Sequence, residues 1–294
     1  MKYTYFPGCS LLNTAKEYDV SARAVMRELD SELVEIPDWN CCGATAADVV
    51  SYLLSISLPA RNLAMAEGMG QEVVATCSSC FLNLYRVNKH LEQDPELKGQ
   101  LDIVLAEAGL SYSGNLRVRH LLDVIANDIG VKAVAKRAER RFAGIKVAPY
   151  YGCQVVRPYA EFDGPDLPMS MDRLIAALGA ETIPYPVKTR CCGGVLMTTQ
   201  KSIGVKLVAD ILEPAKEADC VVTVCPLCQL NLEAYQREVA GKLGWPVRLP
   251  ILYFTQFIGL AFGLPERDLQ LSSHLVSAEK LMMPRSFTSK EAGR

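Results

Sequence analysis

Ten of the eleven cysteines form a five-thiol pattern that occurs twice in the chain. Each copy has a single cysteine, then a Cys-Cys-Gly doublet, then a Cys-x-x-Cys pair. The first set is Cys9, Cys41, Cys42, Cys77 and Cys80, and the second set is Cys153, Cys191, Cys192, Cys225 and Cys228. Clustered thiolates bind zinc or iron–sulfur clusters, but four thiolates complete a tetrahedral zinc site or a cubane cluster. The fifth thiol in each set would bridge two irons, give one iron a second thiolate or stay free near the cluster, and we therefore expect a cluster of unusual shape.

Three other uses of these cysteines explain the pattern less well. Structural disulfides are rare in a reducing cytosol, and adjacent cysteines do not bridge each other without strain. A thioredoxin-like redox motif accounts for one Cys-x-x-Cys pair but not for the doublets. Structural zinc on the doublet and the pair is the main alternative, and it leaves Cys9 and Cys153 without a role. We therefore expect an iron–sulfur cluster in at least one set.

The sequence around the cysteines is repeated as well, which indicates an internal duplication. Cys77 and Cys80 recur 148 residues later as Cys225 and Cys228. The same Leu-Asn-Leu follows each pair, at residues 82–84 and 230–232. A strand-like run followed by glycine precedes both Cys9 and Cys153. Because the flanks agree along with the cysteines, we predict two homologous halves.

Each half alternates short β-like runs with helical runs, which is typical of a parallel sheet with crossover helices. The predicted strands are Lys2–Phe6, Leu33–Pro37 and Glu72–Thr76, then Lys146–Tyr150, Glu181–Tyr185 and Val221–Val224. The predicted helices include Thr14–Leu29, Phe81–Glu92, Met169–Leu178 and Leu230–Val239. Residues 95–142 look helical, and Pro59 is expected to divide the segment after Cys42 into two helices, with Ser57 capping the second.

The predicted fold class is therefore α/β, with two pseudo-symmetric lobes that each have a small parallel sheet flanked by helices. We place the first cysteine-rich domain at residues 1–143 and the second at residues 144–264. Residues 265–294 form a polar tail with an apolar patch at residues 281–283. This tail is either frayed or a docking arm for a partner.

The cysteines follow predicted strands, and ligands of parallel α/β sheets collect at the carboxyl ends of the strands. Three segments that are distant in sequence can therefore converge on each site. Glycines beside the cysteines permit tight turns and close backbone approach to a cofactor, and the candidate cofactor-binding glycines are Gly8, Gly43, Gly152 and Gly193.

Several other residues have side chains that could belong to such a site. The histidines His90, His120 and His274 share no motif and are expected to be surface or packing residues. Cys220 has no counterpart in the first half and is expected to be a small buried hydrophobe. Three cationic residues lie near the second set in the sequence: Arg157, Lys188 and Arg190. Their side chains are either solvated, or they attract an anionic substrate or offset the charge of a cluster.

Bulk composition excludes several classes of protein. The chain is 50% hydrophobic and has a net charge of −2, so it can form a core and has no basic excess for nucleic acid. No apolar run is long enough to span a bilayer, and no secretory signal is recognisable at the N-terminus. We expect a cytoplasmic protein without a membrane span.

The doubled pattern, from Tyr5-Phe6-Pro7-Gly8-Cys9 to Cys228, resembles the cysteine-rich (CCG) domain family and within it the B subunit of heterodisulfide reductases. The resemblance implies that each complete set of five cysteines holds a noncubane [4Fe–4S] cluster, giving two clusters in all. It also implies that a disulfide is cleaved between the clusters, and that the cysteines act in catalysis through them. The implied partners are a protein like the C subunit of these enzymes, with cubane [4Fe–4S] clusters, and a flavoprotein like their A subunit.

The expected function is that of a catalytic iron–sulfur subunit of a heterodisulfide-reductase-like complex. It would reduce a disulfide by two electrons, or oxidise thiols in reverse, on a small-molecule or carrier-bound substrate. Two alternatives remain: an electron-relay iron–sulfur subunit of another dehydrogenase, and a zinc-stabilised scaffold subunit.

Overall fold

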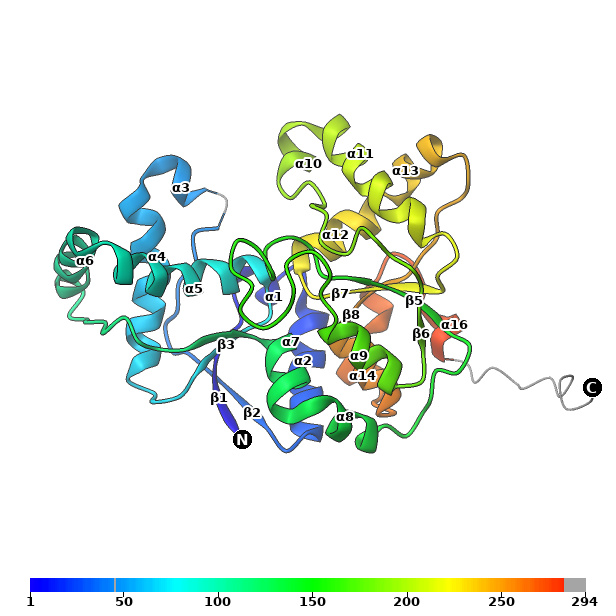
Figure 1. The fold of residues 1–294 in the computed structure, drawn as a ribbon, viewed down its shortest axis with the longest axis horizontal. Helices are drawn as coiled ribbons and strands as arrows, with labels where there is room; N and C mark the ends of the chain where they lie inside the picture. Colours follow the sequence, from blue (N-terminus) through cyan, green and yellow to red (C-terminus); the bar gives the residue numbers. More distant parts are fainter. Residues whose placement is uncertain (45, 283–294) are drawn as a thin grey trace, which may run out of the picture.

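A computed structural model, which describes residues 1–44 and 46–282, contains two four-stranded parallel sheets flanked by helices (Figure 1). The predicted α/β fold class is thus confirmed. The first sheet has the order β2-β1-β3-β4 and the second the order β6-β5-β7-β8, so the two sheets have the same topology. The strands of the first sheet are β1 (Lys2–Phe6), β2 (Glu32–Glu35), β3 (Val73–Ala75) and β4 (Val118–His120). Those of the second are β5 (Lys146–Tyr150), β6 (Glu181–Thr182), β7 (Cys220–Thr223) and β8 (Ile251–Tyr253).

Burial of the central strands explains their nearly continuous apolar sequences. The β3 residues are all buried, and so are those of β7, as expected for parallel strands covered on both faces. Phe6 at the end of β1 pairs with Ala75 at the end of β3, and Tyr150 pairs with Thr223 in the second sheet. The two central strands of each sheet therefore end at the same edge, and the segments that follow them lie together.

Helices of the first lobe, which we define as the first sheet with its helices, surround that sheet on both faces. They are α1 (Cys9–Leu12), α2 (Lys16–Glu28), α3 (Ala47–Val50), α4 (Tyr52–Glu67), α5 (Ser78–Gln93), α6 (Pro95–Glu107), α7 (Leu121–Asp123), the π-helical η1 (Val124–Gly130) and α8 (Val131–Arg137).

The second lobe, the second sheet with its helices, repeats the order strand, helix, strand. Its helices are α9 (Ser170–Ala177), α10 (Leu196–Thr199), α11 (Lys201–Leu212), the 3₁₀ turn η2 (Glu213–Ala215), α12 (Pro226–Ala234), α13 (Gln236–Leu243) and α14 (Phe254–Ala261). The chain then continues through α15 (Glu266–Leu269), the 3₁₀ turn η3 (Leu271–Ser273) and α16 (Glu279–Met282).

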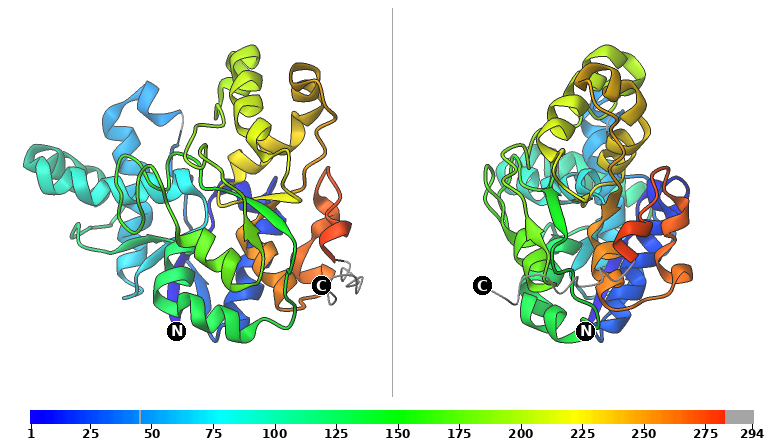
Figure 2. Two further views of the ribbon diagram at one scale, coloured as in Figure 1. Left: turned by 45° about the vertical axis from the view of Figure 1, so that its right-hand side comes forward. Right: turned by 90° about the vertical axis from the view of Figure 1, so that its right-hand side faces the viewer.

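Buried apolar residues from both lobes pack together in shared hydrophobic clusters. Helix α2 of the first lobe packs against α14 and α15, and Figure 2 shows these segments side by side in both views. Tyr18 of α2 stacks on Tyr253 at the end of β8, with ring centroids 4.0 Å apart. Ser21 of α2 and Thr255 of α14 share a buried 2.7 Å hydrogen bond. The lobes are therefore fused by buried apolar and polar contacts.

Some local features differ from the sequence-based expectations. Each sheet has a fourth strand, β4 or β8, which lies in a segment predicted as helical or left unassigned. Both strands are only three residues long, too short to show a clear period. Pro59 lies inside α4 rather than between helices, and Ser51 rather than Ser57 is the N-cap. The segment predicted as Leu230–Val239 is split between α12 and α13.

The C-terminal segment is folded as far as the structure describes it. Leu269, Leu271, Ala278 and Leu281 are all buried in one of the shared hydrophobic clusters. Up to Met282 the segment is therefore packed rather than frayed, because its apolar side chains cover α2 and α14. Met283 of the predicted apolar patch lies outside the described residues.

Candidate metal centre

Two glycine turns bring the first cysteine of each set up to the Cys-x-x-Cys pair. Gly8 and Gly152 follow the ends of β1 and β5 and have φ values of +78° and +72°. A Cβ atom on Gly8 would lie 2.8 Å from the Cys80 sulfur, and one on Gly152 would lie 3.1 Å from the Cys228 sulfur. Glycine is required here because the backbone conformation is left-handed and the sulfur is too close for a side chain.

Both Cys-x-x-Cys pairs sit at helix N-termini. Cys77 is the N-cap of α5 and Cys225 is the N-cap of α12, while Cys80 and Cys228 lie in the first turns of these helices. All four side chains are buried. Unpaired backbone N–H groups and the helix dipole at such termini favour thiolates.

The doublets complete each set from the loops that follow β2 and β6. In the first set, the Cys42 sulfur lies 3.4 Å from that of Cys80, and the Cys41 sulfur lies 3.9 Å from that of Cys9. In the second set, all five cysteines line a single cavity of about 220 Å³. The structure thus brings the predicted cysteines together in two groups, one at the strand ends of each sheet.

The two groups meet where Cys77 faces Cys225. A hydrogen bond with Cys225 raises the pKa of Cys77, and the pKa of Cys225 is held well below its usual value by hydrogen bonds from Cys228 and Cys77. Ser78 and Ser79, which lie between the paired cysteines of the first set, line the cavity of the second set. The first lobe therefore supplies part of the wall around the second group of thiols.

Neighbouring thiols divide into proton donors and proton acceptors. A hydrogen bond from Cys153 lowers the pKa of Cys191 to about 6, and one from Cys228 lowers the pKa of Cys192. The pKa of Cys42 is likewise well below its usual value, because Cys41 and then Cys80 donate to its sulfur. Thiolate is the form of cysteine that binds metals, and the lowered pKa values favour it at Cys42 in the first set and at Cys191, Cys192 and Cys225 in the second.

Two asparagines that sequence reasoning did not assign to the site contact the doublets. The Asn83 amide donates to the Cys42 carbonyl at 3.0 Å and lies 3.8 Å from its sulfur. The Asn231 amide lies 3.3 Å from the Cys192 carbonyl and 3.6 Å from its sulfur. Both are the central residue of the repeated Leu-Asn-Leu, which was the available signal.

The glycine that follows each Cys-Cys doublet, predicted to bind the cofactor, shapes the turn after that doublet. Gly43 and Gly193 have φ values of +75° and +90°, and a Cβ on either would crowd the following helices. The backbone N–H of Gly193 also donates to the Cys191 sulfur at 3.4 Å. Such donors orient ligands and stabilise thiolates around a metal group.

The donor chemistry of each group fits an iron–sulfur cluster. Five sulfurs line the cavity of the second set, two pairs of sulfurs are in contact in the first set, and helix N-termini and amides supply N–H donors around both. The Ser78 hydroxyl is buried and has no hydrogen-bond partner among the described atoms, although it lines the second cavity. Within residues 1–44 and 46–282, no three His, Cys, Asp or Glu side chains are arranged to hold a single metal ion.

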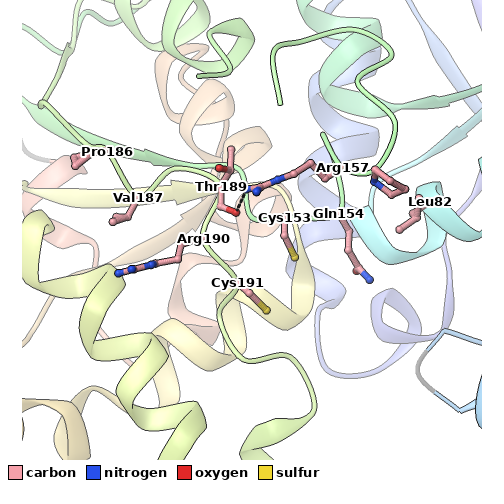
Figure 3. Close-up of a pocket in the computed structure, with 10 residues that line it drawn as sticks. Leu82, Cys153, Gln154, Arg157, Pro186, Val187, Thr189, Arg190 and Cys191 are labelled. Atoms are coloured by element: carbon pink, nitrogen blue, oxygen red, sulfur yellow. Dashed lines mark hydrogen bonds between the residues drawn. The ribbon is translucent and has the colours of Figure 1, made fainter. Parts of the chain in front are cut away.

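The three cations near the second set have different surroundings. Lys188 is buried and forms an ion pair with Asp172, so it is part of the protein interior. Arg190 is half-exposed and lies 3.5 Å from Asp210. Arg157 donates to the Thr189 carbonyl at 2.7 Å. Arg157 and Arg190 line an open pocket that also contains Cys153 and Cys191 (Figure 3).

The remaining candidates lie outside the cysteine groups. Cys220 is buried in β7, and burial raises its pKa. His120 is buried with its pKa lowered to about 4 by desolvation, and its Nδ1 accepts from the Leu122 N–H. His90 contacts Tyr52, and His274 contacts Glu233 and Gln256. These contacts agree with packing roles.

Comparison with known proteins matches both halves to a single family model. The cysteine-rich domain model, CCG, matches residues 3–85 and 147–233, which hold all ten cysteines of the two sets. The chain belongs to the CCG cysteine-rich domain family. Each matched range contains the three separate parts of the motif: the strand–Gly–Cys turn, the doublet and the Cys-x-x-Cys pair.

Several curated proteins are similar over nearly the whole chain. The chain is 36% identical to the 8-methylmenaquinol:fumarate reductase membrane anchor subunit of Wolinella succinogenes, covering 95% of this chain and 99% of that protein. It is 30% identical to a protein of Archaeoglobus profundus described as similar to the heterodisulfide reductase B subunit, covering 91% and 93%. It is 28% identical to the B subunit of the ferredoxin/F420H2-dependent CoB-CoM heterodisulfide reductase of Methanosarcina acetivorans, covering 94% of each. The predicted resemblance to the B subunit of heterodisulfide reductases is thus confirmed.

One solved structure supports the fold. A hypothetical protein from Helicobacter pylori matches with a TM-score of 0.74 and 15% identity, covering 94% of this chain. The match spans about half (52%) of that protein's chain. Separately, no helix within the described part of the chain is long and apolar enough to cross a membrane.

Proposed function

We propose that this chain is the catalytic iron–sulfur subunit of a heterodisulfide-reductase-like complex. Cys9, Cys41, Cys42, Cys77 and Cys80 would hold one noncubane [4Fe–4S] cluster, and Cys153, Cys191, Cys192, Cys225 and Cys228 would hold a second. The reaction is the reduction of a disulfide by two electrons and two protons to two thiols, or its reverse. When bound, such clusters supply one-electron transfer and iron sites that can exchange thiolate ligands.

The observation that carries this proposal is the contact between the two groups of thiols. The Tyr18 hydroxyl lies 3.0 Å from the Thr76 carbonyl and 3.1 Å from the Val224 carbonyl, which directly precede Cys77 and Cys225, and the serines beside Cys77 line the second cavity. Two sulfurs of one disulfide are separated by a single bond, so two metal groups can act on them only if they are neighbours. The fused lobes hold the two groups as neighbours, whereas two independent domains would not.

Similarity to the B subunits of heterodisulfide reductases over nearly their full length supports the same assignment. Electrons would come from a partner protein with cubane clusters, fed by a flavoprotein, in a cytoplasmic complex. The substrate would be a small-molecule or carrier-bound disulfide or thiol.

A relay of electrons without disulfide chemistry is the second candidate. It is favoured by the 36% identity to a component of 8-methylmenaquinol:fumarate reductase, which the chain covers almost completely. In that case the clusters would pass electrons to another protein of the complex, and added thiols would not bind to them.

Replacement of one doublet cysteine tests the proposal. Cys42→Ala and Cys192→Ala should each lower the iron and acid-labile sulfide of anaerobically purified protein from about eight to about four per chain. Each variant should also abolish disulfide turnover by the complex, because both sulfurs must be handled together. Cys220→Ala is the matched control, since Cys220 is buried but belongs to neither group.

Spectroscopy with added thiol separates the two candidate functions. If the cluster spectrum of the wild-type protein changes on addition of a thiol, the catalytic assignment is supported. A spectrum that is unchanged by thiols, with full iron content, would support the relay. Undiminished disulfide turnover after either doublet change would contradict the proposal.

A further inference from the structure

A large open pocket adjoins the second group of cysteines. Its volume is about 950 Å³, which is in the range of pockets for small molecules. Figure 3 shows the sulfur-bearing side chains of Cys153 and Cys191 near the middle of the lining residues, with Arg157 and Thr189 beside Cys153. Pro186 and Val187 supply an apolar wall, and Leu82 reaches the pocket from the first lobe. The pocket thus joins cluster-binding cysteines to a cationic and apolar surface.

Arg157 is held in this pocket without a carboxylate partner among the described residues. Its guanidinium donates to the Thr189 carbonyl at 2.7 Å, and its backbone N–H donates to the Cys153 carbonyl at 3.0 Å. These bonds fix the side chain but leave its charge and its other N–H donors available. Arg190 extends away from the sulfur of Cys191, toward the opposite end of the pocket, where Asp210 lies 3.5 Å from it.

The first lobe has a pocket at the corresponding place, but its two carboxylates, Glu35 and Asp38, are ion-paired with Arg23 and Arg61. It has a volume of about 460 Å³ and is lined by the segment between β2 and the first doublet, including Glu35 and Asp38. Aligned from the first cysteine of each set, Arg157 corresponds to Asn13. Aligned from the doublets, Arg190 corresponds to Asn40, and Lys188 corresponds to Asp38. The two lobes thus share cysteine positions, whereas the positions of Arg157 and Arg190 hold neutral asparagines in the first lobe.

We propose that the pocket lined by Arg157, which we call the Arg157 pocket, binds the anionic group of a small-molecule thiol or disulfide substrate. This inference rests on the proposed function and adds a substrate class and an orientation. Guanidinium groups bind carboxylate, sulfonate and phosphate groups through paired N–H donors. The sulfur attached to the anionic group would therefore be directed to the second set of cysteines, and the other sulfur to the first set.

Alkylation of the cysteines measures this charge difference without requiring a cluster. The full chain is stripped of metal by a chelator under anaerobic, phosphine-reduced conditions, and circular dichroism confirms that the fold is retained. Anionic iodoacetate and neutral iodoacetamide are then compared at each exposed cysteine by peptide mass spectrometry. The ratio of the two alkylation rates at one cysteine is independent of its thiolate fraction. It therefore reports the local electrostatic potential and the binding of anions.

We expect the ratio of the alkylation rate with iodoacetate to that with iodoacetamide to be higher at Cys191 than at its counterpart Cys41. Arg157→Gln should lower the Cys191 ratio about threefold, as expected for loss of one positive charge from the pocket that both residues line, and should leave the Cys41 ratio unchanged. Arg157→Lys should keep most of the preference because it keeps the charge. Equal ratios at the two cysteines, or no effect of Arg157→Gln, would overturn the proposal.

A second measurement tests for anion binding rather than attraction alone. Sodium sulfate should slow the iodoacetate reaction at Cys191 more than sodium chloride of equal ionic strength does, and Arg157→Gln should remove this difference. Equal effects of the two salts would refute a binding site. Because the probes act on metal-free protein, this outcome is distinguishable from failure of the proposed function, which would appear as missing iron or absent disulfide turnover.

Discussion

Cysteines within one set differ in pKa, because the neighbours of each sulfur differ. Cys191 and Cys192 have lowered pKa values, and the thiols that donate to them, Cys153 and Cys228, have raised ones. Spacing in the sequence identified all ten thiols but not this division, which depends on which sulfurs touch. Asn83 and Asn231 were missed for a related reason: the repeated Leu-Asn-Leu marks both residues, but it does not show which group each amide contacts.

We predict that Asn83→Leu lowers the reduction potential of the cluster that we propose for the first set of cysteines. An N–H donor near the Cys42 sulfur stabilises the more negative, reduced state, and leucine has a similar size without the donor. A redox titration followed by electron paramagnetic resonance measures the shift. Loss of the donor to the Cys42 carbonyl should also cost about 1–3 kcal/mol of stability.

Asn88→Leu is the matched control for this prediction. Asn88 lies in the same helix, and its amide donates to the Leu116 carbonyl at 2.7 Å. This change should cost similar stability without moving the potential. If the two variants had the same potential as the wild type, Asn83 would have a structural role alone.

At the scale of the element, the recurring unit is a strand that ends in a tight turn or a helix N-terminus carrying cysteine. Alternating strand and helix patterns predicted β1 and β5 with their observed bounds, and the Gly-Cys turns that follow. The short strands β4 and β8 were not predicted, because three residues are held in the sheet by pairing rather than by their own pattern. Pro59 lies inside α4 although proline usually ends a helix, so its placement was set by packing of the helix as a whole.

We predict that Gly8→Ala prevents assembly of the first cluster. Alanine at a φ of +78° costs about 1–2 kcal/mol, and its Cβ would also displace the Cys80 sulfur, 2.8 Å away. Iron content should therefore fall from about eight to about four per chain. Chemical analysis of iron and sulfide checks this result.

Gly70→Ala separates backbone strain from crowding of the sulfur. Gly70 has a φ of +71°, and a Cβ there would meet no described atom within 4 Å. This variant should lose a similar amount of stability and keep its full iron content. Retention of full iron by Gly8→Ala would show that the close approach to Cys80 is not needed for assembly.

For the whole molecule, the decisive feature is the fusion of the two lobes through shared hydrophobic clusters. The Tyr18 hydroxyl lies 3.0 Å from the Thr76 carbonyl and 3.1 Å from the Val224 carbonyl. These residues directly precede Cys77 and Cys225, so one side chain of α2 is bonded to both cysteine segments. The relative position of the two groups of thiols is therefore fixed by a buried contact.

We predict that Tyr18→Phe destabilises the protein by about 1–3 kcal/mol, because two buried carbonyls lose their shared donor. It should also change the magnetic interaction between the two clusters in the reduced protein. Denaturant titration measures the first effect, and electron paramagnetic resonance line shape measures the second.

Tyr185→Phe provides the comparison within one lobe. The Tyr185 hydroxyl is buried and donates to the Ile211 carbonyl at 2.8 Å, both in the second lobe. Its loss should reduce stability without altering the interaction between clusters. If both variants left the magnetic interaction as in the wild type, Tyr18 would stabilise the core without setting the distance between the groups.

The sequence by itself determined the two sets of cysteines, the duplicated α/β pattern and the family resemblance. These are local properties, since periodicity encodes which backbone conformation forms and which face is apolar. The tertiary structure decided that Cys77 meets Cys225, that the lobes share hydrophobic clusters, and that Arg157 rather than Lys188 is available beside the second set. Such contacts join residues as far apart as Tyr18 and Val224, separated by 206 positions. They depend on how the packed helices place the two sheets, which no local pattern specifies.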